Sequence, residues 1–247
     1  MNINKVTSIL TAAILALSAT SCNNDETLMY NNSTLGNYID GTYTSDQGNI
    51  FNIVSQECSG RIDTMYRVLT VCDVLNRTEG GKENEYDVRV TFMKEILVKD
   101  IVTLGTEVEE EVKVEDPINI ENIWLSGGYI NMIISFPFKD VSISHMINLV
   151  QQESEEAGTY SFRLTHNAFE DAIKDNIAVG YGVSGGYVSF PINSLMTEEE
   201  AILNITWKGF NVNNLTEVKE HKLQGTYKKD GFEHTPLTAP KTKAAIR

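Results

Sequence analysis

The chain has 247 residues, 34 Asp and Glu against 20 Lys and Arg, a formal net charge of -14 and 41% hydrophobic residues. This apolar content is too high for a disordered chain, and the length allows one large domain or two small ones. Because Lys and Arg contacts to phosphates supply most of the affinity for nucleic acids, a chain this acidic is not expected to bind DNA or RNA.

Residues 1–21 are predicted to be an export signal. After Lys5 comes a short apolar stretch, Val6 to Ala19, which ends in small residues before Cys22. A transmembrane anchor, the competing interpretation, needs roughly 20 predominantly apolar residues, and this stretch is shorter and diluted by Thr and Ser. A Cys at this place resembles the lipobox of bacterial lipoproteins, although Ala19 stands where that motif usually has Leu. We therefore expect Cys22 to be acylated and to become the new N-terminus.

Residues 22–37 are polar and rich in Asn, which is typical of a flexible stalk. Asp25 and Glu26 resemble the acidic signal that sends some Gram-negative lipoproteins to the outer face of the outer membrane; a solvated tether is the alternative. Removal of the signal also removes Lys5, its only charged side chain, so the mature side-chain charge becomes -15. Lipid, assisted by no basic patch, must then hold the protein to the membrane.

From residue 38 the dominant period of hydrophobicity is two, which predicts strands with at least one buried face. Apolar side chains alternate with other residues along Tyr86–Met93, Ile130–Phe138 and Ala201–Lys208. Shorter strand candidates are Asn49–Val54, Arg67–Leu75, Met146–Val150, Tyr160–Thr165 and Tyr187–Ile192. The predicted fold class is therefore all-β.

A boundary between two small domains is expected in the acidic run that begins at Glu107. Val108, Val112 and Val114 keep a strand alternation against acidic neighbours, and Pro117 then interrupts it. We divide the chain into domains at 38–116 and 117–224, followed by a loose tail at 225–247. One short helical stretch, Ala168 to Lys174 with Asn167 as its cap, is interpreted as part of a loop, and Thr197–Glu200 is left open between a turn and a strand.

Several stretches, taken in order, resemble the NigD-like lipoproteins. The segments Ile123–Ser135, His145–Val150, Phe162–Asn167, Gly186–Phe190 and Ile205–Lys208 resemble the C-terminal β-sandwich of that family. Upstream, Gly41–Asn49 and Arg67–Leu75 resemble its N-terminal OB-type barrel. The resemblance implies a small OB-like barrel followed by a β-sandwich. It implies no catalytic residues, because none are associated with the family. The family name derives from a proposed bacteriocin-immunity role.

No strong catalytic, metal or cofactor motif is present. The four histidines share no zinc-site spacing with another His, a Cys or a Glu. His166 follows Tyr160, Phe162 and Leu164 on one strand face, where it is either a buried base or a core histidine with its hydrogen bonds satisfied. The glycines of Gly180–Gly186 precede a strand and not a helix, so we interpret them as a turn or bulge and not as a phosphate loop.

Acidic clusters and tryptophans admit two interpretations each. The clusters around Glu109–Glu111 and Glu153–Glu156 lack the Asp and Gly arrangement of a calcium loop and are expected to be solvated. Trp124 and Trp207 are candidates for a sugar-stacking platform if they lie at the surface, but Trp207 falls on an apolar strand face, which favours core packing.

Two modifications besides lipidation are considered. Export would allow a disulfide between Cys58 and Cys72, although Cys72 sits mid-strand, where a buried free thiol is equally ordinary. Thr64, in Asp63-Thr-Met65, resembles the short O-glycan acceptor of some Gram-negative exported proteins.

The sequence as a whole predicts a non-enzymatic lipoprotein without cofactors, anchored to the outer membrane and binding a partner. A bacteriocin-immunity role would involve a cationic peptide, attracted by the negative charge. The alternatives are a glycan-binding accessory protein of a surface uptake system and a hydrolase that uses His166 with a nearby carboxylate.

Overall fold

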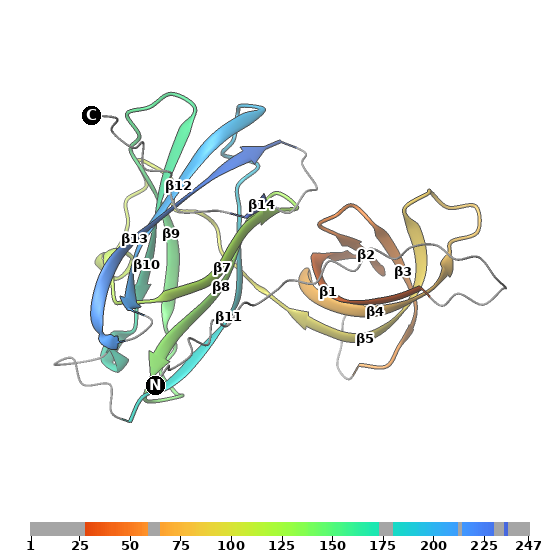
Figure 1. Ribbon diagram of the computed structural model, residues 1–247, viewed down its shortest axis with the longest axis horizontal. Helices are drawn as coiled ribbons and strands as arrows, with labels where there is room; N and C mark the ends of the chain where they lie inside the picture. Colours follow the sequence, from red (N-terminus) through yellow and green to blue (C-terminus); the bar gives the residue numbers. More distant parts are fainter. Residues whose placement is uncertain (1–27, 59–64, 173–179, 212–213, 230–234, 237–247) are drawn as a thin grey trace, which may run out of the picture.

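The computed structural model describes residues 28–58, 65–172, 180–211, 214–229 and 235–236. The expected export signal, Cys22 and Thr64 lie outside these residues. Figure 1 shows two β domains side by side, a small barrel and a larger sandwich, joined after strand β5 (Glu85–Glu95). Within the described residues, no helix has the length and apolar character needed to span a bilayer.

The first domain is a closed five-stranded barrel with the strand order β1-β2-β3-β5-β4. Its other strands are β1 (Leu28–Ile39), β2 (Thr42–Ser45), β3 (Ile50–Gln56) and β4 (Arg67–Arg77). Only β3 and β5 pair in parallel, and β1 closes the barrel against β4. This is the topology of an OB-type barrel, and its interior holds the alternating side chains that the sequence predicted, among them Phe51, Val88 and Val90.

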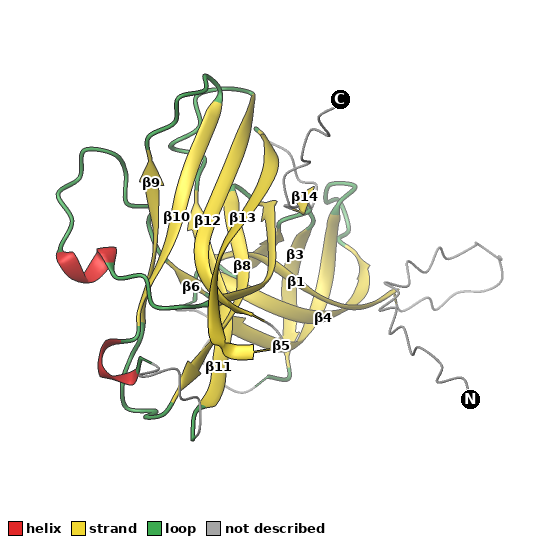
Figure 2. Cartoon of the chain, turned by 60° about the vertical axis from the view of Figure 1, so that its left-hand side comes forward, coloured by secondary structure: helices red, strands yellow, loops and turns green. Residues whose placement is uncertain are grey.

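The second domain is a β-sandwich of two sheets. The first sheet has the order β13-β12-β10-β9, and the second has the order β14-β7-β8-β11-β6. The strands are β6 (Leu97–Val98), β7 (Asn119–Ser126), β8 (Tyr129–Phe138), β9 (Met146–Gln152), β10 (Thr159–Asn167), β11 (Gly182–Pro191), β12 (Glu200–Asn211), β13 (Asn214–Lys228) and β14 (Thr235–Pro236). Figure 2 shows the two short 3-10 helices, η1 (Glu110–Lys113) and η2 (Phe169–Asp171), outside the sheets.

The two sheets enclose one apolar core. Phe162, Leu164, Leu203 and Ile205 from the first sheet face Ile130 and other side chains of the second, and all five are fully or almost fully buried. Each such side chain contributes roughly 1.5–3 kcal/mol by leaving water. Their alternate neighbours, such as Arg163 and Thr206, therefore point to the outer face of the first sheet.

The structure changes three of the expected boundaries. Strand β1 begins at Leu28, inside the expected stalk, because the segment closes the barrel against β4. The barrel ends at Glu95, well before residue 116, because β6 already pairs with β11 of the sandwich. The expected tail also contributes strands: β13 continues to Lys228 and β14 pairs with β7.

Two local expectations also differ. The alternation over Val108 to Val114 forms no strand, because the acidic run turns into η1 and pairs only singly, through the bridge from Glu115 to His166. The short helical run after Asn167 appears as η2 alone, with residues 173–179 outside the described part. The residue before η2 is Ala168, so the expected cap at Asn167 is wrong, although the side-chain oxygen of Asn167 accepts a hydrogen bond from the Phe169 backbone N–H at 2.8 Å.

Candidate functional site

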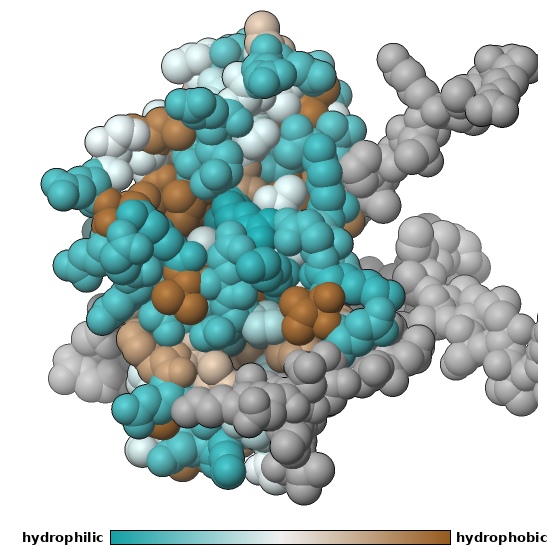
Figure 3. Space-filling model, turned by 90° about the vertical axis from the view of Figure 1, so that its left-hand side faces the viewer, coloured by the Kyte–Doolittle hydropathy of each residue, from teal (hydrophilic) through white to brown (hydrophobic). Residues whose placement is uncertain are grey.

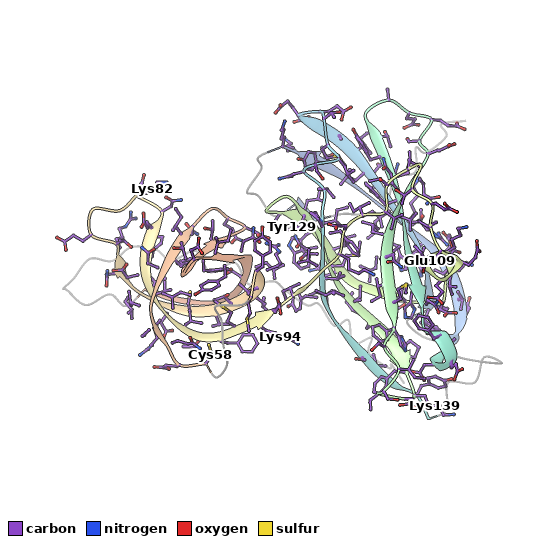
Figure 4. The ribbon with its side chains drawn as sticks, turned by 180° about the vertical axis from the view of Figure 1, so that it is seen from behind. Cys58, Lys82, Lys94, Glu109, Tyr129 and Lys139 are labelled. Atoms are coloured by element: carbon purple, nitrogen blue, oxygen red, sulfur yellow. The ribbon has the colours of Figure 1, made fainter. Side chains whose placement is uncertain are left out.

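A buried polar cluster joins the barrel to the sandwich. Arg67, fully buried at the start of β4, makes two hydrogen bonds of 2.5 and 2.7 Å to the carboxylate of Asp46. From the sandwich, the side-chain oxygen of Asn131 accepts from Arg67 at 2.8 Å, and Ser126 donates to Asp46 at 2.6 Å. Tyr129 stacks against the guanidinium at 4.1 Å, and Figure 4 places this tyrosine at the junction. The side chains that bond to this ion pair are thus themselves buried.

Apolar contacts surround this cluster. Leu35 of the barrel, Ile96 of the connection and Trp124 of β7 form one buried group, against which Leu69 and Tyr187 pack. Burial, followed by the hydrogen bond that the Tyr129 hydroxyl makes to Tyr66, raises the pKa of Tyr129 to about 12. Closely packed side chains of this kind hold the two domains in one orientation.

A second buried cluster lies at one end of the sandwich. His145 Nδ1 is 3.0 Å from His166 Nε2, and His145 Nε2 is 3.2 Å from the carboxylate of Asp171. The other nitrogen of His166, Nδ1, faces the carbonyl oxygen of Pro117 at 3.2 Å. The ring of Phe136 stacks on His145 at 4.5 Å between centroids. The antiparallel pairing of β9 with β10 brings the two histidines together.

The proton positions in this cluster follow from its acceptors. A carbonyl oxygen only accepts, so His166 Nδ1 carries a proton and, in the neutral ring, Nε2 accepts from His145 Nδ1. Burial, and then the neighbouring His145, lower the pKa of His166 to about 4, so this ring is neutral at pH 7. Burial opposes ionisation of Asp171, but hydrogen bonds from the Lys139 backbone and from His145 outweigh it and hold its pKa below the ordinary value. His145 thus lies between the ring of His166 and the carboxylate of Asp171, with one ring nitrogen facing each.

This arrangement leaves no position for a substrate. His166 is 1% exposed, and the side chains of His145 and Asp171 are 2% and 3% exposed. The carboxylate that the hydrolase alternative required contacts His145 and not His166. His166 is therefore the core histidine with satisfied hydrogen bonds, which was one of the two interpretations that the sequence left open.

An open groove lies on the outer face of the first sheet. Figure 4 places Glu109, which lies on the segment beside it, on the side of the sandwich away from the barrel. The groove has a volume of about 450 Å³ between residues 108–115 and strands β9, β10 and β12. Three valines, Val108, Val112 and Val150, line it, together with the polar residues Lys113, Glu115, Gln152, Arg163, Thr165 and Thr206. Figure 3, which views the molecule from this side, shows apolar patches separated by hydrophilic side chains.

The charged side chains that line the groove are paired, whereas three carboxylates of the segment beside it are not. Glu115 accepts from Arg163 at 2.7 and 3.0 Å and pairs with Lys208 at 2.8 Å, and these contacts, led by the hydrogen bonds from Arg163, lower its pKa to about 2. Arg163 also pairs with Glu220. On the segment that contributes Val108 and Val112 to the groove, Glu107, Glu109 and Glu111 are exposed and, within the described residues, take part in no ion pair, whereas Glu110 pairs with Lys113. The groove is thus apolar on one side and flanked by negative charge.

The remaining candidate residues are placed as follows. Trp124 and Trp207 are 7% and 5% exposed, so the sugar-stacking platform suggested for them is wrong: both pack in the interior. Cys72 is buried in the barrel core, and Cys58 packs against that core. Both are free thiols in the structure. No group of three or more potential ligands for a metal ion occurs among the described residues.

The turn or bulge expected at Gly180–Gly186 is wrong for Gly182–Gly186, which belong to β11 and pair with β8 without a register shift. Gly127 and Gly128, with φ of 59° and 83°, form the turn between β7 and β8. In β11, a Cβ on Gly185 would lie 2.1 Å from the carbonyl oxygen of Ile134.

Comparison with known proteins identifies the second domain. Residues 100–221 match the family model of the NigD-like C-terminal β-sandwich domain. The chain carries a NigD-like domain. This confirms the resemblance found in the sequence, and it begins the NigD-like domain at residue 100, close to the end of the barrel and not at 117.

Solved structures share the fold of about four fifths of this chain. A NigD-like immunity protein from Bacteroides caccae is 17% identical, with a TM-score of 0.58 over 80% of this chain and 96% of that one. A candidate lipoprotein from Bacteroides fragilis is 12% identical, with a TM-score of 0.55 over 81% and 98%. A candidate toxin-related protein from Parabacteroides distasonis is 20% identical, with a TM-score of 0.55 over 80% and 92%. At these identities the likeness shows the fold alone. No curated protein matches the chain significantly.

Proposed function

We propose that this chain is a non-catalytic, exported lipoprotein of the NigD-like family that binds a cationic amphipathic peptide in the groove beneath η1. The observation that carries the proposal is the groove itself, which combines an apolar valine wall with exposed, unpaired carboxylates on the segment beside it. The buried histidine cluster, by contrast, offers no surface to a substrate.

Long-range attraction supports the same partner. The mature chain, without residues 1–21, carries a side-chain charge of -15. Such a charge accelerates encounter with a cationic peptide, and the apolar wall retains its hydrophobic side chains after contact. A peptide bacteriocin at the cell surface is a partner of this chemistry, so the proposed biological role is immunity.

Peptide binding can be tested with a defined probe, an octapeptide of alternating Lys and Leu, and its Glu-Leu counterpart. We expect calorimetry to detect saturable binding of the Lys-Leu peptide only. The double substitution Glu109→Lys with Glu111→Lys should weaken it at least tenfold. The matched control, Glu79→Lys with Glu83→Lys, makes the same change of charge on exposed barrel residues and should have little effect. Equal weakening by both pairs would show attraction by net charge without a site.

The anchor is tested at Cys22. Metabolic labelling with an alkyne fatty acid should mark the wild-type protein and leave the Cys22→Ala variant unlabelled. Equal labelling of both would refute lipidation at this residue. Glycopeptide mass spectrometry of the protein from its native host tests the O-glycan proposed at Thr64, which an unmodified peptide throughout would contradict.

The immunity role needs a cellular test. A deletion strain challenged with supernatants of competing bacteria should become more sensitive than its parent, and crosslinking on intact cells should recover a cationic peptide. Unchanged sensitivity, together with recovery of uptake proteins bound to sugar, would instead favour a glycan-binding accessory role.

A further inference from the structure

A cationic segment of this chain, residues 237–247, follows β14 and lies outside the described residues. It contains Lys241, Lys243 and Arg247 and no Asp or Glu, in a chain whose formal net charge is -14. In an extended chain, side chains two residues apart share a face, so these three cations fall on one side and Ile246 falls on the other. The segment therefore has the alternation of cationic and apolar side chains that the groove is proposed to bind.

The pairing of β14 directs this segment along β7. The two strands are antiparallel, with Thr235 opposite Leu125 and Pro236 opposite Trp124 (Figure 1). Each further residue of β14 is thus opposite an earlier residue of β7. The chain leaves β14 in the direction of Asn119, the first residue of β7.

The start of β7 adjoins the groove. The Ile118 N–H donates to the Lys208 carbonyl at 2.9 Å, and the Lys208 side chain pairs at 2.8 Å with Glu115, which lines the groove. The nine residues 115–123 span about 30 Å when fully extended, and the eleven residues 237–247 span about 36 Å. The segment is therefore long enough to follow β7 back to the groove.

The groove offers charges and apolar surface that complement the segment. Glu107, Glu109 and Glu111 are exposed and, in the part of the chain that the structure describes, take part in no ion pair. Val108 and Val112, between these glutamates, line the groove. Because the segment belongs to the same molecule, its effective concentration at the groove is on the order of 1 mM, so even a weak attraction produces substantial occupancy.

We propose that residues 237–247 bind in the groove of their own chain, with the three cations toward the glutamates and Ile246 toward the valines. Bound there, the segment competes with an external cationic peptide, which must displace it. The competition rests on the proposed function, whereas the docking of the segment does not.

Photocrosslinking on the full-length chain in detergent micelles tests the docking. The photoreactive residue p-benzoylphenylalanine takes the place of Ile246, and the crosslinked peptides are identified by mass spectrometry. We expect crosslinks to residues 108–112 or 150–152, which line the groove, within the monomer. Crosslinks to the barrel alone, or none to the groove, would overturn the docking. Crosslinks to the groove found only in a dimer would assign the segment to a second copy and overturn docking within one chain.

Charge reversal beside the groove makes this test specific. Glu109→Lys with Glu111→Lys should lower the yield of these crosslinks by about fivefold or more, because like charges then repel. Glu79→Lys with Glu83→Lys makes the same change of net charge on exposed barrel residues and should leave the yield unchanged. An equal yield in the two variants would refute the role of the glutamates and with it the proposed docking.

Competition is measured with the Lys-Leu octapeptide. Lys241→Glu with Lys243→Glu should raise its affinity by about threefold or more in calorimetry, the gain expected when the segment occupies about two thirds of the grooves. The control Lys82→Glu with Lys94→Glu makes the same change of net charge on exposed barrel residues and should give a smaller gain. Equal gains would show an effect of net charge alone and would refute the competition.

The two proposals can fail separately. Crosslinks to the groove, without any binding of the octapeptide by the Lys241→Glu with Lys243→Glu variant, would support the docking and refute the groove as the site of an external peptide. Octapeptide binding that this variant leaves unchanged, without crosslinks to the groove, would refute the docking and support the proposed function.

Discussion

Both buried polar clusters of this protein compensate for the removal of polar side chains from water, but they do so with different chemical groups. At the junction, Arg67 and Asp46 form an ion pair, while the neutral side chains of Asn131 and Ser126 make further hydrogen bonds to it. At the end of the sandwich, an equally buried cluster depends on the number of protons shared by His145 and His166. The comparison shows that burial alone does not make a polar cluster responsive to pH. A buried cluster responds to pH only when it contains a group that gains or loses a proton in the pH range of interest.

The largest expected effect is loss of the junction ion pair. Arg67→Ala leaves the Asp46 carboxylate buried without its cation, which typically costs about 3–5 kcal/mol. Urea denaturation of the variant should show this loss of the free energy of unfolding. The double variant Arg67→Met with Asp46→Leu removes both charges and should lose much less. A loss below about 1 kcal/mol for Arg67→Ala would contradict the structural role assigned to the junction.

The second prediction concerns the histidine cluster and acid. The pKa of His166 in the folded chain is lowered to about 4. Between about pH 6.5 and 4 the unfolded chain therefore binds a proton at this ring that the folded chain does not bind. The contribution of His166 to the free energy of unfolding is therefore fully present above about pH 6.5. It falls as the pH drops toward 4, by about 3 kcal/mol in total. The difference in unfolding free energy between wild type and His166→Gln, measured by urea denaturation across this range, should show this trend. A difference that does not vary with pH would count against it.

A smaller effect is expected at the turn that touches the junction. Gly127 has φ of 59°, and a Cβ there would lie 2.3 Å from the Asp46 carboxylate, so Gly127→Ala combines backbone strain with displacement of the ion pair. We expect a loss of about 2–3 kcal/mol. Gly80→Ala is the matched control, because Gly80 has φ of 73° but open space around it, and should cost about 1 kcal/mol. Equal losses in thermal or urea unfolding would show that strain alone acts at Gly127.

The smallest effect concerns the cysteines. Burial raises the pKa of Cys72 to about 11, so iodoacetamide at pH 8 should modify Cys58 much faster than Cys72 in the folded protein. Intact-mass measurement with and without reductant tests the disulfide that export would allow. Two alkylated thiols in the unreduced, denatured sample would exclude that bond.

Much of the architecture could be predicted from the sequence. The alternation over Tyr86–Met93 and Ile130–Phe138 identifies strands, because a half-buried strand needs a period of two whatever it packs against. The all-β class and the order of barrel and sandwich followed from such segments together with the family resemblance. The exact domain boundary did not, because β6 is only two residues long and is defined by its pairing with β11.

The candidate site depended far more on tertiary structure. His166 could be singled out from its strand, but His145 precedes another strand, and only the antiparallel register of β9 and β10 brings their rings to 3.0 Å. Arg67, Asp46 and Asn131 carry no recognisable motif, since their contacts join residues far apart in the chain. The groove exists because the acidic run folds over a sheet face formed by β9, β10 and β12. Local patterns determine which faces are buried, because burial follows the periodicity of the chain itself. The meeting of distant polar groups is decided only when strands pair, because hydrogen bonds need atoms within about 3 Å and the local sequence does not encode that distance.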